Sequence, residues 1–196
     1  NLDIPFNDHL IGESYFFKNK KINKPMDFSG KNYMSLVEQH NFLIQLIFPE
    51  ISNSKSQLEL TESDYEFLLR EMSLLPRESE FPKYGEDYHD SYCKFFIYGN
   101  SKERMPDHVK IFNKVGLAYG FLLDNAYIVD LENKIEFFLS AVVYSNSNGV
   151  LNDDSYDYDT LTIPFLADVG RSIYEYELKR DREFDPDLSH LNKIDL

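Results

Sequence analysis

Apolar residues recur at helical spacing in two segments of the first half of the chain. In NYMSLVEQHNFLIQLIFPE the spacing favours a helix that ends before Pro49. In LTESDYEFLLREMSLLP, Thr61 is suited to an N-cap, acidic residues follow it, and Pro76 ends the pattern. The apolar positions of the two predicted helices are Leu36, Val37, Leu43, Ile44 and Ile47 in the first, and Tyr65, Leu68, Leu69, Met72 and Leu75 in the second.

The segments on either side of these helices show weaker patterns. Residues 1–31 alternate turn formers with the aromatic run SYFF and the basic cluster KNKKINK. We expect loops with one or two short strands there, with the basic cluster at a solvated hairpin tip. In DSYCKFFIYG, Gly99 is suited to the position that follows a helix C-terminus, so we expect a third, short helix.

The pattern changes from helical to extended after residue 107. HVKIFNKVG begins an extended segment, and two runs rich in β-branched and aromatic residues follow, YGFLLDNAYIVDL and KIEFFLSAVVYSN. The dipeptide EN separates these runs, a length typical of a tight hairpin. The pattern therefore predicts three antiparallel strands, of which the last two are neighbours.

A loop, a helix and a tail complete the predicted order. SNSNGVLNDDSYDYDT is typical of a polar, acidic loop. IPFLADVGRSIYEYELKR is typical of an amphipathic helix, with Pro164 near its start and Lys179 and Arg180 near its end. We expect the tail DREFDPDLSHLNKIDL to be loosely held.

This order predicts an α+β fold in which an antiparallel sheet is flanked by helices. Three strands and one following helix make a thin core, since a sheet needs both faces covered and its edges protected. We therefore expect further strands from elsewhere. The chain divides into an entry segment of loops and short strands (1–31), a helical part (32–100), three antiparallel strands plus the C-terminal helix (101–180) and an acidic tail (181–196), together one incomplete domain.

Composition narrows the classes of partner. The formal net charge is −14, from 34 acidic and 20 basic side chains, which argues against nucleic acid and anionic membranes as partners. No run of 18 apolar residues is present, so no transmembrane segment is expected. The single cysteine, Cys93, allows neither a disulfide within the chain nor a cysteine-based metal site. Because the sequence starts with Asn1 and has no signal-peptide pattern, we expect a processed product or a fragment of a longer protein.

Few residues have the spacing of a metal or nucleophile site. The five histidines are scattered and the acidic loop lacks EF-hand spacing, so we expect no metal and no cofactor. Binding of a cation by residues 152–159 stays open. Ser-x-x-Lys occurs as SNSK at residues 52–55 and as SYCK at residues 91–94, and we interpret both as coincidental. Cys93 is interpreted as a buried small side chain rather than a nucleophile.

A set of motifs in one order resembles the C-terminal half of the penicillin-recognising serine hydrolases, which include the class A β-lactamases and their relatives. LTESDYEFLLREM is similar to a helix of that family, and RMPDHVKIFNKVG to the approach to its Lys-Thr-Gly strand. NAYIVDLEN and KIEFFLSAVVYSN resemble the two strands that follow, and PFLADVGRSIYEY resembles the C-terminal helix. The likeness covers about residues 26–180 and is closest to secreted serine hydrolases of Bacteroidetes-type bacteria.

The resemblance implies a β-lactamase/transpeptidase-like fold and roles for four consecutive residues. Lys114 takes the place of the catalytic lysine of Lys-Thr-Gly, whose ammonium helps to bind the substrate carboxylate and polarises the serine network. Gly116 would let substrate lie against the strand edge, and Leu117 would give its main-chain N–H to the oxyanion hole. Val115 stands in this substrate-binding strand where the family has Thr or Ser, so a hydroxyl is absent.

Two features separate this chain from a complete enzyme of the family. Leu122, Leu123 and Asp124 occupy the neighbourhood where many β-lactamases carry an arginine for the substrate carboxylate. The family's Ser-x-x-Lys and Ser-x-Asn motifs belong upstream of the second helix, where this chain has no place for them. The resemblance therefore implies the C-terminal portion of a serine hydrolase that acts on an amide or ester through an acyl-enzyme.

The same resemblance implies partners and location. The missing N-terminal half would be the main partner, the substrate would be a small molecule or a peptide, and the isolated chain would be inactive. The location would be periplasmic or extracellular, with an anchor, if one exists, in the absent N-terminus. Two alternatives stay open: a non-catalytic, penicillin-binding-protein-like module that binds peptidoglycan or a protein, and a soluble α+β domain in which Lys-x-Gly is only a strand turn.

Overall fold

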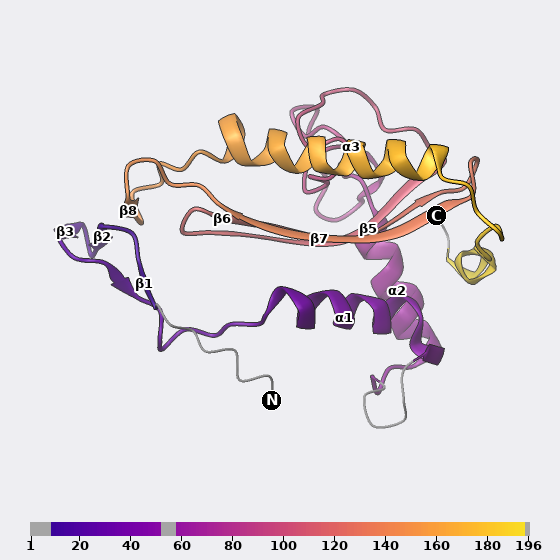
Figure 1. The fold of residues 1–196 in the computed structure, drawn as a ribbon, viewed down its shortest axis with the longest axis horizontal. Coiled ribbons are helices and arrows are strands. Elements are labelled where there is room, and N and C mark those ends of the chain that lie inside the picture. Colours follow the sequence, from indigo (N-terminus) through magenta and orange to yellow (C-terminus); the bar gives the residue numbers. More distant parts are fainter. Residues whose placement is uncertain (1–8, 52–57, 195–196) are drawn as a thin grey trace.

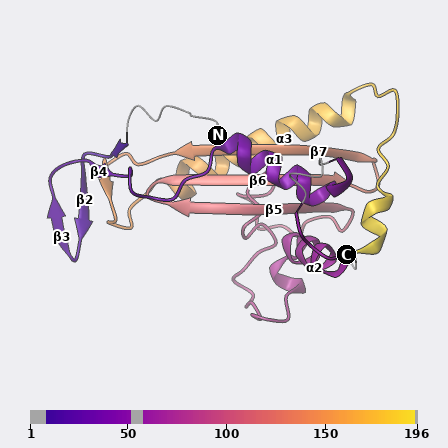
Figure 2. The same cartoon turned by 90° about the horizontal axis from the view of Figure 1, so that it is seen from below.

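A three-stranded antiparallel sheet is the centre of the computed structural model, which describes residues 9–51 and 58–194. The strands lie in the order β5–β6–β7, with α3 across one face, α1 across the other and α2 beside β5 (Figure 1 and Figure 2). This architecture is α+β, as the sequence predicts. The bounds are Val109–Ala118 for β5, Phe121–Asp130 for β6, Ile135–Tyr144 for β7, Leu36–Ile47 for α1, Glu62–Ser73 for α2 and Ile163–Lys179 for α3.

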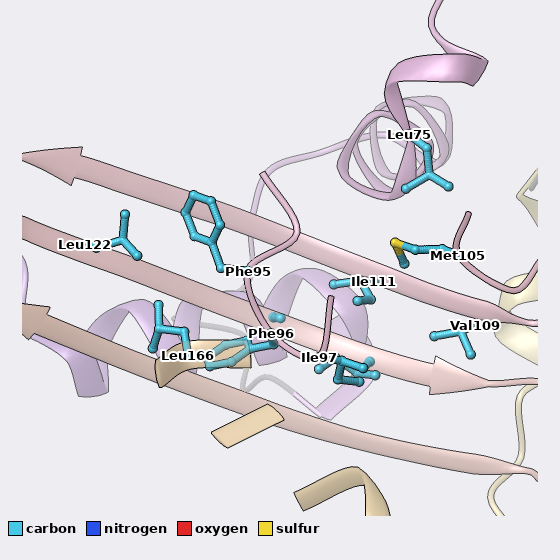
Figure 3. Close-up of a cluster of buried hydrophobic side chains, with 11 residues drawn as sticks. Leu75, Phe95, Phe96, Ile97, Met105, Val109, Ile111, Leu122 and Leu166 are labelled. Carbon is cyan, nitrogen blue, oxygen red and sulfur yellow. The ribbon is translucent and has the colours of Figure 1, made fainter. Parts of the chain in front are cut away.

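The two faces of the sheet bury separate clusters because side chains alternate along each strand. The cluster under α3 joins the two strands β5 and β6 to a loop and to α3 itself, as Figure 3 shows. The cluster on the other face packs β5 and β6 against α1, α2 and the C-terminal tail. The buried strand residues are Val109, Ile111, Leu122, Ala126 and Ile128 on the α3 face, and Phe112, Tyr127 and Val129 on the α1 face.

The three long helices confirm the predictions from apolar spacing and caps. Ser35 and Glu38 form a capping box at the start of α1, and Thr61 and Asp64 form one at the start of α2. Both helices end ahead of the prolines that the sequence marked as stops. Within the described residues, no helix is long and apolar enough to span a lipid bilayer.

The expected third helix is wrong. The segment that follows residue 90 forms turns, and Cys93 and Ile97 have positive φ angles of 60° and 69°, which a right-handed helix excludes. The physical reason is a buried carboxylate: Asp124 accepts the main-chain N–H groups of Phe95 at 3.0 Å and Phe96 at 3.3 Å. These donors therefore bond across to the sheet instead of within a helix.

The connections between the long strands differ from the predicted hairpin. The loop between β6 and β7 has four residues, 131–134, because the Asp130 carboxylate accepts the N–H groups of Glu132 and Asn133, each at 2.9 Å. The two-residue turn joins β5 to β6 instead. It consists of Tyr119 and Gly120, whose φ angles of 56° and 87° suit a tight hairpin.

Short strands gather at the end of the sheet where β5 and β7 finish (Figure 1). Four come from residues 9–31, the described part of the entry segment, more than the one or two expected, and the basic cluster does form the tip of the β2–β3 hairpin. The acidic loop contains a strand that the sequence did not reveal, β8, which pairs in parallel with β2. The bounds are Leu10–Ile11 for β1, Ser14–Phe17 for β2, Lys20–Ile22 for β3, Met26–Asp27 for β4 and Val150–Leu151 for β8.

The tail is not loosely held. A short 3-10 helix, Ser189–Lys193, places Leu191 against the cluster on the α1 face, where Ile194 is also buried. The apolar side chains of LSHLNKI therefore close this end of the core, a packing that the polar composition of the tail concealed.

Candidate functional site

The outer edge of β5 is covered along one half and open along the other. The Ile111 carbonyl accepts from the Lys94 ammonium at 2.9 Å, so the main-chain groups of Ile111 point away from β6. Main-chain direction alternates along an antiparallel strand, so Asn113, Val115 and Leu117 also point outward. No described residue bonds these three main-chain N–H groups. Asn113 is buried, so the accessible half of the edge is formed by Val115 and Leu117, two of the residues singled out in the sequence.

Lys114 lies beside this open edge. Its neighbour two residues earlier, Phe112, packs on the α1 face, so the Lys114 side chain lies on that face as well. Its ammonium donates to the Val115 carbonyl and borders a hollow of about 540 Å³ between α1, α2 and the sheet. The hollow is largely apolar, and Lys114 is its cationic group. The other lining residues are Met34, Gln39, Phe42, Leu43, Leu46, Leu58, Glu59, Leu60, Leu68, Met72 and Asn125.

The residues that follow Lys114 reach the edge in different ways. Val115 packs its side chain against the cluster on the α3 face, so only its main-chain groups lie at the edge. Gly116 returns to the Lys114 face, and a Cβ there would meet only Leu123 atoms at 3.7 and 3.8 Å, ordinary contact distances. Leu117 is 54% exposed, and its N–H points outward. The four predicted residues therefore form one continuous edge, with the ammonium on one side of it.

A row of polar side chains crosses the sheet next to Lys114. Asn125 pairs in register with Lys114 on one side and with Ser140 on the other. The Ser140 hydroxyl donates to Asn125 Oδ1 at 2.6 Å and lies 2.7 Å from His40 Nδ1, while Asn125 Nδ2 donates to the Gln39 carbonyl at 2.9 Å. Because His40 and Gln39 belong to α1, this row fixes the helix over the sheet.

Sequence reasoning missed this row because its members stand far apart in the chain. The signal that could have found it is the register of the two hairpins. With the turn placed at Tyr119 and Gly120, Lys114 falls opposite Asn125, and the four-residue loop before β7 brings Ser140 opposite Asn125. The predicted turn at Glu132 and Asn133 lies at the centre of this loop and gives the same register, so the signal that was missed is the turn at Tyr119 and Gly120.

A second lysine, Lys94, belongs to a closed polar network under the α3 face. Its ammonium donates to the Met72 carbonyl at 2.6 Å, the Ile111 carbonyl at 2.9 Å and Asn113 Oδ1 at 2.8 Å. Asn113 Nδ2 in turn donates to Asp124 Oδ1 at 2.8 Å. Burial lowers the pKa of Lys94 to about 8 and raises that of Asp124 to about 6, each against the opposing charge of the other.

The other motifs of the sequence have ordinary surroundings. The Ser91 hydroxyl donates to the Ser101 carbonyl at 2.6 Å, while Lys94 is committed to its three acceptors, so SYCK has the geometry of a structural segment. SNSK lies outside the described residues. Burial raises the pKa of the Cys93 thiol, which disfavours its nucleophilic form. Across residues 9–51 and 58–194, no three His, Cys, Asp or Glu side chains form a group that could hold a metal ion.

Asp124 is turned away from the candidate site. Its carboxylate lies on the α3 face, fully buried among the donors of Asn113, Phe95 and Phe96, whereas Lys114 lies on the α1 face. Asp124 therefore holds the 93–97 segment against the sheet. Comparison with family models, with curated proteins and with solved structures finds no match to this chain.

Proposed function

We propose that this chain is the C-terminal portion of a β-lactamase-like serine hydrolase that cleaves an amide or ester through an acyl-enzyme. In this proposal it contributes the Lys-x-Gly strand and half of the oxyanion hole, and an upstream part of the same polypeptide contributes the serine. Secretion to the periplasm or the cell exterior belongs to the same proposal, since it follows from the same resemblance.

The observation that carries the proposal is the open half of the β5 edge. Val115 and Leu117 present main-chain groups outward, and the Lys114 ammonium lies at their side. A substrate that pairs with this edge as an extended segment brings a carbonyl toward the Leu117 N–H. The ammonium of Lys114 has spare donors for a carboxylate or for a nearby serine hydroxyl, because the Val115 carbonyl takes only one of its three.

Gly116 and Val115 support this reading in different ways. Packing within the described residues does not require glycine at position 116, since a Cβ would make only ordinary contacts with Leu123. A bare position on the Lys114 face is therefore free for contact with a substrate or an upstream segment. Val115 stands where the family has a Thr or Ser hydroxyl. Its side chain packs toward α3, so its main-chain groups are still exposed at the edge of β5.

The test uses the full-length product of the parent gene and a fluorophosphonate probe, which labels an activated serine. We expect labelling to require the upstream half and to fall about 100-fold in Lys114→Ala, the scale of losing one preorganised charge-stabilising group. Lys110→Ala is the matched control, since Lys110 lies four residues earlier on the same face of β5 and should leave labelling unchanged. Unchanged labelling in Lys114→Ala would remove the role given to that residue.

The second candidate is a non-catalytic module that binds peptidoglycan or a protein. It is favoured by the apolar Val115 and by Asp124, which faces away from the edge and provides no cation for a substrate carboxylate. The sequence of the parent gene separates the two functions. An upstream Ser-x-x-Lys supports the hydrolase, whereas its absence, together with sedimentation of the protein with purified peptidoglycan, supports the binding module.

A further inference from the structure

The hollow beside Lys114 is a place where the apolar core of the α1 face opens to solvent. Helix α1 crosses β6 and β7 while α2 lies beside β5, and the hollow of about 540 Å³ lies between the two helices and the sheet (Figure 2). Leu43 and Leu46 line it and belong to the buried cluster of that face. Met34 and Phe42 line it as well, and they are 49% and 47% exposed. Apolar side chains therefore continue through the hollow from the core to the surface.

The hollow has the size and lining of a small-molecule site. Such sites measure about 300–1,000 Å³ and combine mainly apolar walls with a few placed polar groups. Two of the four methionines of the chain, Met34 and Met72, belong to the wall. The thioether side chain of methionine is flexible, so it adapts to apolar ligands of different shape. This wall offers few hydrogen bonds, so it suits a hydrocarbon chain better than a sugar or a nucleotide.

The hydrogen-bond donors of the hollow stand together on the sheet. Lys114 of β5 and Asn125 of β6 are partners in register, so their side chains lie next to each other on the α1 face. The Lys114 ammonium has two donors besides the one given to the Val115 carbonyl. The Asn125 amide gives one N–H to the Gln39 carbonyl, and its second N–H has no acceptor among the described residues. Adjacent donors of this kind match the two oxygens of a carboxylate.

The charge at this place is opposite to that of the chain as a whole. A net charge of −14 attracts cations to the surface and repels anions. Among the described residues that line the hollow, Lys114 is the one cation and Glu59 the one acid, and no described carboxylate forms an ion pair with Lys114. An anion bound here is therefore held by Lys114 against the charge of the rest of the chain.

We propose that the hollow binds a carboxylate that carries an unbranched apolar chain. The carboxylate lies on Lys114 and Asn125, and the chain lies along the apolar side chains of α1 and α2. The apolar wall alone would accept any hydrophobic group, and the ammonium alone would accept any anion. A ligand that satisfies both has an anionic head and an apolar chain. The inference deepens the proposed function and rests on it for one point, that this carboxylate is a substrate or product of the hydrolase.

Three probes with the same chain and different head groups test the site. Octanoate, octanol and octylamine are titrated into the 196-residue chain at pH 7 and followed by calorimetry. Octanoate should bind at least about tenfold more tightly than octylamine, the reverse of the order that the net charge alone would give. Hexanoate should bind more weakly than octanoate, by up to about fourfold for each methylene removed, because each buried methylene adds to the hydrophobic free energy of binding.

Two variants with matched controls locate the two ends of the ligand. Lys114→Met removes the charge and keeps an apolar side chain, so octanoate should lose about tenfold in affinity while octanol is not weakened. Lys110→Met is its control, because Lys110 lies on the same face of β5 and does not line the hollow. Phe42→Ser removes part of the apolar wall and should weaken octanoate and octanol alike. Phe67→Ser should change neither, because Phe67 is a 61% exposed residue of α2 outside the hollow.

Three outcomes overturn the proposal. Octylamine that binds as tightly as octanoate shows that the acidic surface, and not Lys114, selects the head group. An octanoate affinity that Lys114→Met leaves unchanged shows that the carboxylate lies elsewhere. Failure of all three probes to bind shows that protein fills or closes the hollow in solution. Failure of the hydrolase proposal is read separately in the full-length protein, from fluorophosphonate labelling that Lys114→Ala does not alter, so ligand binding and catalysis can fail independently.

Discussion

Two lysines that approach β5 differ in how their ammonium donors are used. Lys94 is buried and places its donors on three acceptors, the carbonyls of Met72 and Ile111 and the amide oxygen of Asn113. Lys114 is exposed, donates to the carbonyl next to it and borders an open hollow. A lysine whose donors are all satisfied inside the fold contributes to its stability, whereas one with spare donors beside an open strand edge is available to a ligand.

The largest effect that we expect is a difference in unfolding free energy between variants of the two lysines. Lys94→Met removes three buried hydrogen bonds and leaves their acceptors, together with the Asp124 charge, without the cation, so the free energy of unfolding should fall by about 3–5 kcal/mol. Lys114→Met removes one exposed contact and should change it by less than about 0.5 kcal/mol. Urea denaturation followed by circular dichroism measures both. Equal losses in the two variants would contradict the distinction drawn here.

The next effect concerns the pH dependence of the closed network. Burial raises the pKa of Asp124 from 3.8 to about 6 in the folded chain, so the folded state binds more protons than the unfolded state between these values. The contribution of Asp124 to the unfolding free energy is therefore fully present below pH 3.8. As the pH rises from 3.8 to about 6, this contribution falls by about 3 kcal/mol.

Asp124→Asn isolates this contribution. The variant is less stable at every pH, because an amide cannot accept from all the donors around Asp124. The difference in unfolding free energy between wild type and variant should nevertheless narrow as the pH rises from about 4 to about 6. A difference that stays constant over this range would show that Asp124 ionises at its ordinary pKa in the fold.

The contrast between the lysines also shows what sequence could predict. Periodicity and caps predicted α1, α2 and α3, because these signals are local: Thr61 caps the helix that follows it, and Pro49 lies just past the end of α1. The extended runs predicted three antiparallel strands. Lys114, Val115, Gly116 and Leu117 were predicted as neighbours because they are consecutive in one strand.

What could not be predicted depends on contacts between distant residues. The 90–99 segment was expected to form a helix, but the Asp124 carboxylate, about thirty residues later, takes the N–H groups that a helix would use. The three acceptors of Lys94 likewise come from α2 and β5. The alignment of Lys114 with Asn125 required the turn at Tyr119 and Gly120, which was not predicted from the sequence, whereas the predicted turn at Glu132 and Asn133 already gives the register that sets Ser140 opposite Asn125.

The substitution with the smallest expected effect on stability, Gly116→Ala, is the sharpest test of the substrate site proposed beside Lys114. Gly116→Ala adds a methyl group on the Lys114 face, where it would touch only Leu123 at ordinary distances, so the unfolding free energy should change by less than about 0.5 kcal/mol. In the full-length protein the same methyl would occupy the space beside the edge that the proposal gives to substrate, so fluorophosphonate labelling should fall severalfold.

Gly120→Ala is the contrasting control: its φ is 87° and its Cβ would lie 3.0 Å from the Ser145 carbonyl oxygen, so it should lower stability. If Gly116→Ala leaves both stability and labelling unchanged, the open half of β5 is not where substrate binds, and the spare donors of Lys114 would have no assigned partner.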